Sequence, residues 1–170
     1  DGTGRIFVAS SRDPGLTRLA LDIAPGGVVR QGGAATLTGT AQDDLLMAGE
    51  GVTLMDGGPG DDILVTAEGA GAAIQLRGGA GSDLFVIAPG AGQTVLLDYQ
   101  PGSDRIDLTL LPMLRSLAQV EITATTDGAI LRAGEAVIRI VTTTGKPLGL
   151  ADFTDAALFP FSRYDPAPPV

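Results

Sequence analysis

Cysteine and histidine are absent from the 170-residue chain, and their absence removes several kinds of chemistry. Without cysteine there is no disulfide and no thiolate nucleophile. Without histidine the chain lacks the commonest general base and the usual ligand of transition metals. A Ser-His-Asp triad and a histidine-bound zinc ion are therefore excluded within these residues. Oxygen ligands remain, and they suit a hard cation such as calcium.

Basic residues and long apolar runs are also scarce. The chain has 11 basic residues against 20 acidic ones, which gives a formal net charge of -9. A nucleic-acid-binding protein needs a basic patch, so we expect no nucleic-acid partner. No apolar run is long enough to span a bilayer, so we expect no transmembrane segment. The chain starts at Asp1 without a signal-peptide pattern, so we expect a fragment, a processed product or the tail of a longer protein.

Glycine, by contrast, is plentiful. It supplies 25 of the 170 residues, about twice the usual share. Such a content indicates many tight turns rather than long helices. Hydrophobic residues make up 44% of the chain, which is enough for the core of one domain. Short runs of apolar residues alternate with turns that contain glycine and aspartate, and this pattern predicts an all-β fold.

Nine-residue blocks repeat in the middle of the chain. In frame they read GTAQDDLLM (39–47), AGEGVTLMD (48–56), GGPGDDILV (57–65), TAEGAGAAI (66–74) and, after three inserted residues, GGAGSDLFV (78–86). Each block is expected to form a glycine-rich turn followed by a three-residue strand. The middle residue of that strand, Leu64 or Phe85, would point into the core because alternate side chains face opposite ways. Two blocks then make one coil, and successive coils stack as parallel strands.

The complete blocks resemble the calcium-binding nonapeptides of the RTX, or haemolysin-type, family, whose pattern is G-G-x-G-x-D-x-U-x with U a large apolar residue. The resemblance implies a short right-handed parallel β-roll at residues 37–96. It also implies a C-terminal antiparallel β cap with a secretion-signal region at 97–170. Residues 1–36 lie outside the repeats and are expected to form an N-terminal β-meander, with strands at 5–10, 16–23 and 28–31. That meander is either a cap over the first coil or a remnant of a preceding domain.

The aspartates of the blocks are unevenly distributed. Alternate turns of a β-roll lie on the same side, so Asp44, Asp62 and Asp83 would form one row and the degenerate blocks the other. Stacked strands lie about 4.8 Å apart. Two carboxylates at that distance repel by roughly 1 kcal/mol in water and about 3 kcal/mol at an effective dielectric constant of ~20. A divalent cation with several oxygen ligands would reverse this repulsion, so binding and folding should be coupled.

The resemblance also implies where calcium would bind. One ion would lie between residues 39–44 and 57–62, and a second between 57–62 and 78–83, held by carboxylates and main-chain carbonyls. The candidate ligands in these turns are Gly39, Ala41, Asp43, Asp44, Gly57, Pro59, Gly60, Asp61, Asp62, Gly78, Ala80, Gly81, Ser82 and Asp83. The segment VLLDYQPGSDRIDLT resembles the acidic stretch that follows the last repeat in this family, and it adds Asp98 and Asp104 as candidates.

Three functions are compatible with these residues. The favoured one is a non-catalytic calcium-binding module that folds outside the cell and serves as the secretion and stability tail of a larger secreted protein. Its partners would be calcium ions and the type I secretion machinery of a Gram-negative bacterium, and its location extracellular or on the cell surface. The second is a calcium-dependent adhesive or self-assembling surface module that binds polysaccharide or another copy. The third is the non-catalytic part of a secreted hydrolase, with any catalytic domain upstream of Asp1.

Overall fold

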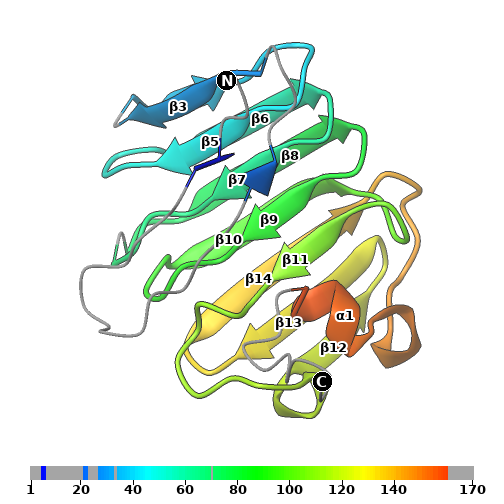
Figure 1. Ribbon diagram of the computed structural model, residues 1–170. Coiled ribbons are helices and arrows are strands. Elements are labelled where there is room, and N and C mark those ends of the chain that lie inside the picture. Colours follow the sequence, from blue (N-terminus) through cyan, green and yellow to red (C-terminus); the bar gives the residue numbers. More distant parts are fainter. Residues whose placement is uncertain (1–4, 7–20, 23–26, 33, 70, 161–170) are drawn as a thin grey trace, which may run out of the picture.

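The structure is a computed structural model, and it describes residues 5–6, 21–22, 27–32, 34–69 and 71–160. Two large β-sheets make up most of this part of the chain (Figure 1). Helix within the described ranges is limited to three short segments: η1 (Leu117–Gln119), η2 (Leu150–Asp152) and α1 (Asp155–Leu158). The expected all-β class is therefore confirmed. No helix among the described residues has the length and apolar character needed to cross a membrane.

The chain alternates between the two sheets along most of its length. The seven-stranded sheet contains, in spatial order, β12 (Glu121–Thr125), β13 (Gly128–Ala133), β14 (Ala136–Thr142), β10 (Gln93–Tyr99), β8 (Ile74–Ala80), β6 (Leu54–Pro59) and β4 (Thr36–Thr38). The five-stranded sheet contains β11 (Arg105–Asp107), β9 (Leu84–Val86), β7 (Ile63–Val65), β5 (Leu45–Ala48) and β3 (Val29–Gly32). From β3 to β11, strands with odd numbers lie in one sheet and strands with even numbers in the other. All pairings among these nine strands are parallel.

Side chains between the two sheets form the main core. Leu46, Leu64, Phe85 and Ile106 occupy matching positions on neighbouring strands of the five-stranded sheet, and all four are fully buried. Met55, Leu76 and Leu96 stack in the same way on the seven-stranded sheet and are equally buried. The expectation that Leu64 and Phe85 point into the core is confirmed. Each such side chain contributes about 1.5–3 kcal/mol through removal from water, so the coil is held together by apolar layers that run along its length.

The prediction of an N-terminal meander is wrong for its third strand. Strands β1 (Arg5–Ile6) and β2 (Leu21–Asp22) pair antiparallel, as a meander requires. Strand β3, however, pairs parallel with β5 and belongs to the five-stranded sheet. The remainder of the two preceding predicted strands lies outside the described residues. Short polar strands such as β3 have little pattern of their own, and stacking on the next coil decides their partner.

The C-terminal part extends the coil as well as capping it. Strands β12, β13 and β14 form the expected antiparallel arrangement, but β14 also pairs parallel with β10. The seven-stranded sheet therefore continues from the coil into the cap without interruption (Figure 1). Helix α1 lies against β11, where Leu108 N donates a hydrogen bond to Leu158 O at 3.0 Å. The last strand of the five-stranded sheet is thus covered by a helix and not by another coil.

Candidate functional site

Four turns that lead from the seven-stranded sheet to the five-stranded sheet lie along one edge of the coil. They comprise residues 39–44, 57–62, 78–83 and 99–104, and we call this side the acidic edge. Because all the strands that enter these turns are parallel, their carboxyl ends meet at the same edge. The edge therefore stacks equivalent turn residues directly above one another.

The last residue of each turn is a buried aspartate. Asp44, Asp62, Asp83 and Asp104 are between 0% and 3% exposed, and we call them the aspartate ladder. The backbone N–H of Asp44 donates to Asp62 Oδ1 at 2.8 Å, that of Asp62 to Asp83 Oδ1 at 3.0 Å, and that of Asp83 to Asp104 Oδ1 at 3.1 Å. One oxygen of each carboxylate thus ties a coil to the preceding one. These charge-assisted bonds explain how buried carboxylates are tolerated at all.

The fourth turn is a repeat that the sequence motif does not reveal. Residues Tyr99 and Gln100 stand where the other turns have Gly-Gly or Gly-Thr, so the pattern is lost. The structure nevertheless pairs Arg105–Asp107 with Leu84–Val86, which places Asp104 next to Asp83. A spacing of 21 residues separates Asp83 from Asp104, as it separates Asp62 from Asp83. This constant spacing is the feature of the sequence that could have revealed the fourth turn.

The second oxygens of the ladder differ between its ends and its middle. Asp44 Oδ2 accepts hydrogen bonds from Thr40 N at 2.5 Å and Thr40 Oγ1 at 3.0 Å. Asp104 Oδ2 accepts one from Gln100 N at 2.7 Å. Asp62 Oδ2 and Asp83 Oδ2 are buried and have no hydrogen-bond partner in the part of the chain that the structure describes. We call these two atoms the open oxygens.

Glycine begins each of the first three turns because the ladder leaves no room for a side chain. A Cβ atom placed on Gly57 would touch Asp62 Oδ2 and would lie only 2.6 Å from Gly78 O. A Cβ atom on Gly39 would lie 2.5 Å from Asp44 Oδ2 and would touch Gly57 O. A side chain at either position would therefore collide with a carboxylate oxygen of its own turn and with a carbonyl oxygen of the next turn.

Burial raises the pKa of Asp62, Asp83 and Asp104. It moves the pKa of Asp62 to about 6 and that of Asp83 to about 7, with the neighbouring aspartates adding to the shift. Burial likewise raises the pKa of Asp104 to about 6. Hydrogen bonds from the backbone N–H groups oppose these shifts only in part. In the absence of a cation, the folded chain therefore holds these carboxylates ionised at a free-energy cost at neutral pH.

Asp98 lies beside the ladder and not on it. Its two carboxylate oxygens accept hydrogen bonds from Gly78 N and Gly79 N, each at 3.0 Å. The side chain is half-buried, and burial raises its pKa. It therefore fastens the third turn to β10 through main-chain donors, which leaves its role as a metal ligand a prediction.

A second, outer row of side chains runs along the exposed rim of the turns. Asp61 N donates to Asp43 Oδ1 at 2.9 Å, and Ser82 N donates to Asp61 Oδ1 at 2.8 Å. The carboxylates of Asp43 and Asp61 thus hold neighbouring turns together at the surface. Ala80 O accepts a hydrogen bond from Gly60 N at 2.8 Å, so this carbonyl also links two turns.

The remaining candidate carbonyls belong to residues of the same turns. These residues are Ala41, Pro59 and Gly81, which lie at the exposed rim. Within the described ranges, acidic side chains form no group of three or more that could hold a metal ion by themselves. A hard cation at this edge would therefore have to draw most of its ligands from main-chain carbonyls.

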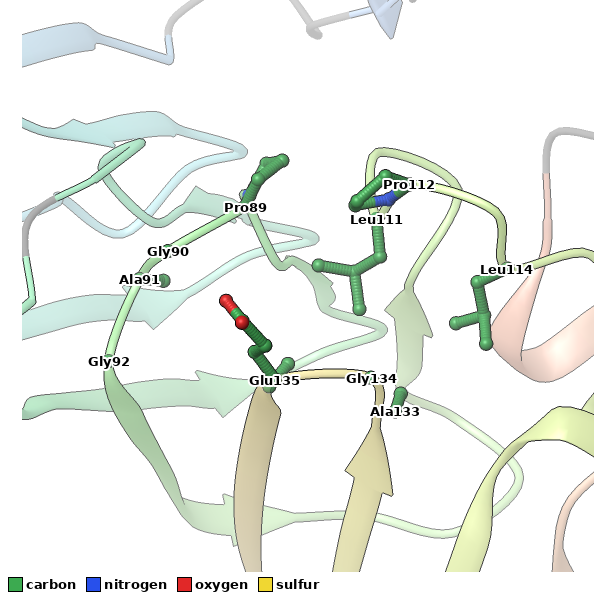
Figure 2. A pocket seen from close by; sticks show the side chains of 11 residues that line it. Pro89, Gly90, Ala91, Gly92, Leu111, Pro112, Leu114, Ala133, Gly134 and Glu135 are labelled. Atoms are coloured by element: carbon green, nitrogen blue, oxygen red, sulfur yellow. The ribbon is translucent and has the colours of Figure 1, made fainter.

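The opposite edge of the coil contains no comparable row of carboxylates among the described residues. There, Gly69 N donates to Pro89 O at 2.9 Å and Ala88 N donates to Thr66 Oγ1 at 2.8 Å. A pocket of about 200 Å³ lies where this edge meets the cap (Figure 2). Its lining residues are Pro89, Gly90, Ala91, Gly92, Leu111, Pro112, Leu114, Ala133, Gly134, Glu135 and Ala136. Glu135 provides the one carboxylate among these mostly apolar lining residues, which is too few ligands for a cation.

Comparisons with protein-family models, with curated proteins and with solved structures find no match to this chain. The interpretation of the acidic edge therefore rests on its residues and their geometry.

Proposed function

We propose that the chain is a calcium-binding module of the RTX type and that its coil is a right-handed β-roll. Two features support the proposal: nine-residue blocks with the nonapeptide pattern, and a chain that alternates from β3 to β11 between two sheets through parallel strand pairs. The calcium ions would lie at the acidic edge, between turns one coil apart. Asp44, Asp62 and Asp83 would contribute carboxylate oxygens, and the turn residues would contribute carbonyl oxygens.

The observation that carries the proposal is the pair of open oxygens in the middle of the ladder. Asp62 Oδ2 and Asp83 Oδ2 are buried, and neither accepts a hydrogen bond from the described residues. Carboxylate and carbonyl oxygens are the ligands that calcium prefers in proteins. A bound calcium ion would supply the positive charge that these oxygens lack. The donor set therefore fits a hard divalent cation.

Binding of this kind would be coupled to folding. Without a cation, the ladder brings four carboxyls with mutual repulsion into the interior of one edge. A ligand that binds only the folded state stabilises it in proportion to the logarithm of its concentration, by about 4 kcal/mol at a thousand times its dissociation constant. A chain with this property would stay loosely folded at low calcium concentration and fold at high concentration.

The biological role follows from this coupling. The module would pass through a type I secretion machinery in a poorly folded state and fold outside the cell, where it would stabilise a larger secreted protein. The module itself would not be an enzyme. Calcium and the secretion machinery would be its partners.

Circular dichroism and thermal unfolding of the metal-free chain test the proposal. Addition of millimolar calcium should increase the β-sheet signal and raise the melting temperature by roughly 10 °C or more, and a chelator should reverse both changes. Magnesium at the same concentration is the control, because it prefers smaller and more regular sites. Identical spectra and melting curves with calcium and with chelator would refute calcium binding.

A further inference from the structure

The two sheets differ in the side chains that they turn away from the main core. In β4 and β8 of the seven-stranded sheet, buried apolar residues alternate with exposed polar ones, which are Thr36, Thr38, Gln75 and Arg77. In the five-stranded sheet, β5 begins with LLM, β7 reads ILV and β9 reads LFV, so both faces carry apolar side chains. Parallel strands have such continuous apolar runs when both faces of their sheet are covered.

The outward side chains of the five-stranded sheet form a second apolar cluster, separate from the main core. They stack in two rows, and each row takes one side chain from each of three successive coils. The first row is Leu45, Ile63 and Leu84, and the second is Met47, Val65 and Val86. We call these six residues the outer face. Because its rows cross three coils, the outer face exists only where the coils are stacked.

The middle of the outer face is shielded from water. Leu45 and Val86 are 0% exposed, and Leu84 is 5% exposed. At the two ends of the first row, by contrast, Val29 is 50% exposed and Arg105 is also exposed. A side chain that stands on an open sheet face keeps part of its surface in water. Another part of the same chain must therefore lie on the middle of this face.

The C-terminal cap accounts for this cover at one end only. Leu110 packs against the second cluster, and α1 contacts β11, the last strand of the sheet. Strand β5 lies three strands away from β11, which is about 14 Å at the usual spacing of strands. A different segment must therefore cover Leu45.

The N-terminal segment has the pattern that such a cover needs. Strands β1 and β2 pair antiparallel, with Ile6 opposite Leu21. The sequence continues this alternation with Val8, Leu19 and Ile23, which predicts a hairpin with one apolar side. A two-stranded hairpin is at best marginally stable by itself, so it needs a surface to pack against. Figure 1 draws β1 and β2 in front of the five-stranded sheet.

We propose that the outer face is the docking surface for the N-terminal hairpin, residues 5–22, and that the hairpin forms a third layer across three coils. The hairpin would then cover a face of the coil and not its open first end. Docking and coil formation stabilise one another, because a segment that binds only the stacked coils favours the stacked state. The proposal is independent of the calcium function, since no residue of the outer face is a candidate ligand.

Thiol labelling tests the proposal, because the chain has no cysteine of its own. Ile63→Cys places one thiol in the middle of the outer face. Val95→Cys, at a residue that is also half-buried but lies on the outward side of the seven-stranded sheet, is the matched control. Each variant is compared with and without the paired change Ile6→Asp and Leu21→Asp, which puts two opposed carboxylates into the hairpin. All measurements are made in millimolar calcium, so that a coil that needs the ion is folded.

The paired change should speed the reaction of a maleimide with the Ile63→Cys thiol by at least about 10-fold. The reaction of the Val95→Cys thiol should change by no more than about twofold, because its sheet face does not contact the hairpin. Equal labelling of Ile63→Cys with and without the paired change would overturn the proposal. Labelling that speeds up on dilution, together with a dimer in size-exclusion chromatography, would place a second copy on the outer face and would overturn it as well.

A spin label at Asp22→Cys gives a second measurement that keeps the apolar side of the hairpin intact. It should broaden the amide NMR signals of residues 45–47 and 63–65. It should leave the signals of β12, at the far end of the seven-stranded sheet, unchanged. Broadening confined to β3 and β4 would show that the hairpin stays at the open end of the coil, which would contradict the proposal even if the paired aspartate change unfolds the chain.

Discussion

At the acidic edge, buried carboxylates join successive turns, whereas main-chain and hydroxyl groups join them at the opposite edge. The carboxylates of Asp62, Asp83 and Asp104 each accept a hydrogen bond from a backbone N–H of the preceding turn, so each of these links places a carboxylate at this edge. Thr66 performs the same linking task for Ala88 without any charge. Both edges connect the same two sheets, and at the opposite edge Thr66 links two turns without a charge. A hydroxyl can therefore perform this link, and the acidic edge differs by burying carboxylates for it.

Glycine-to-alanine substitutions should give the largest difference in unfolding free energy between the two edges. Gly57→Ala would push a Cβ atom against Asp62 Oδ2 and Gly78 O, and we expect a loss of about 3 kcal/mol of unfolding free energy. Gly71→Ala at the opposite edge has no heavy atom within 4 Å of the new Cβ, so only its φ of 63° opposes the change, at about 1 kcal/mol. Urea unfolding of both variants measures the difference. Equal losses of unfolding free energy in the two variants would mean that the ladder does not exclude a side chain at Gly57.

The next effect concerns pH. The pKa of Asp62 is raised from 3.8 to about 6 and that of Asp83 to about 7 in the folded chain, so the folded state binds more protons than the unfolded state between these limits. Metal-free protein should therefore lose stability as the pH rises from about 4 to 7, and level off above 7.

Saturating calcium should reverse this trend, because the cation binds the ionised carboxylates. Urea unfolding at several pH values, with metal-free and calcium-loaded protein, provides the measurement. A metal-free chain that becomes more stable from pH 5 to pH 7 would contradict the raised pKa values.

A smaller effect is expected from the hydroxyl that links turns at the opposite edge. Thr66→Val keeps the shape of the side chain but leaves Ala88 N without its acceptor at 2.8 Å, which should cost about 1–2 kcal/mol. Because no carboxylate of the ladder is involved, the loss should be the same with and without calcium. A loss that depends on calcium would show that the two edges are energetically coupled.

The smallest effect is expected at the exposed rim of the acidic edge. Asp61→Asn retains an oxygen that can accept from Ser82 N, and the side chain is exposed. We expect a change of no more than about 0.5 kcal/mol in unfolding free energy. Comparison with Asp62→Asn, one residue further along, distinguishes the rim from the buried ladder. A larger effect at Asp61 than at Asp62 in calcium would place the cation outside the ladder.

Much of the acidic edge could be predicted from the sequence. The blocks at 57–65 and 78–86 predicted the turns, the short strands and the inward side chains of Leu64 and Phe85. They also predicted that Asp44, Asp62 and Asp83 share one side. These features are local, because glycine and aspartate specify a turn and the alternation of a strand specifies which side chain faces inward.

Other parts of the site could not be predicted. The role of β3 as a strand of the five-stranded sheet depends on stacking against β5, and its own residues carry no strong pattern. The fourth turn does not show the nonapeptide pattern because Tyr99 and Gln100 replace the motif residues, although the resemblance named Asp104 as a candidate ligand. Only the pairing of β11 with β9 places Asp104 in the ladder.

By itself, the sequence determined the repeating turn-and-strand unit and the row of aspartates, since both follow from the spacing of residues within one or two blocks. The tertiary structure decided which carboxylate oxygens have donors. Thr40 N donates to Asp44 Oδ2, and Tyr99 O accepts a hydrogen bond from Thr143 N of the cap, whereas Asp62 Oδ2 and Asp83 Oδ2 have no donor among the described residues. The direction of a carbonyl depends on strands about 20 residues away or more, and no local pattern encodes it.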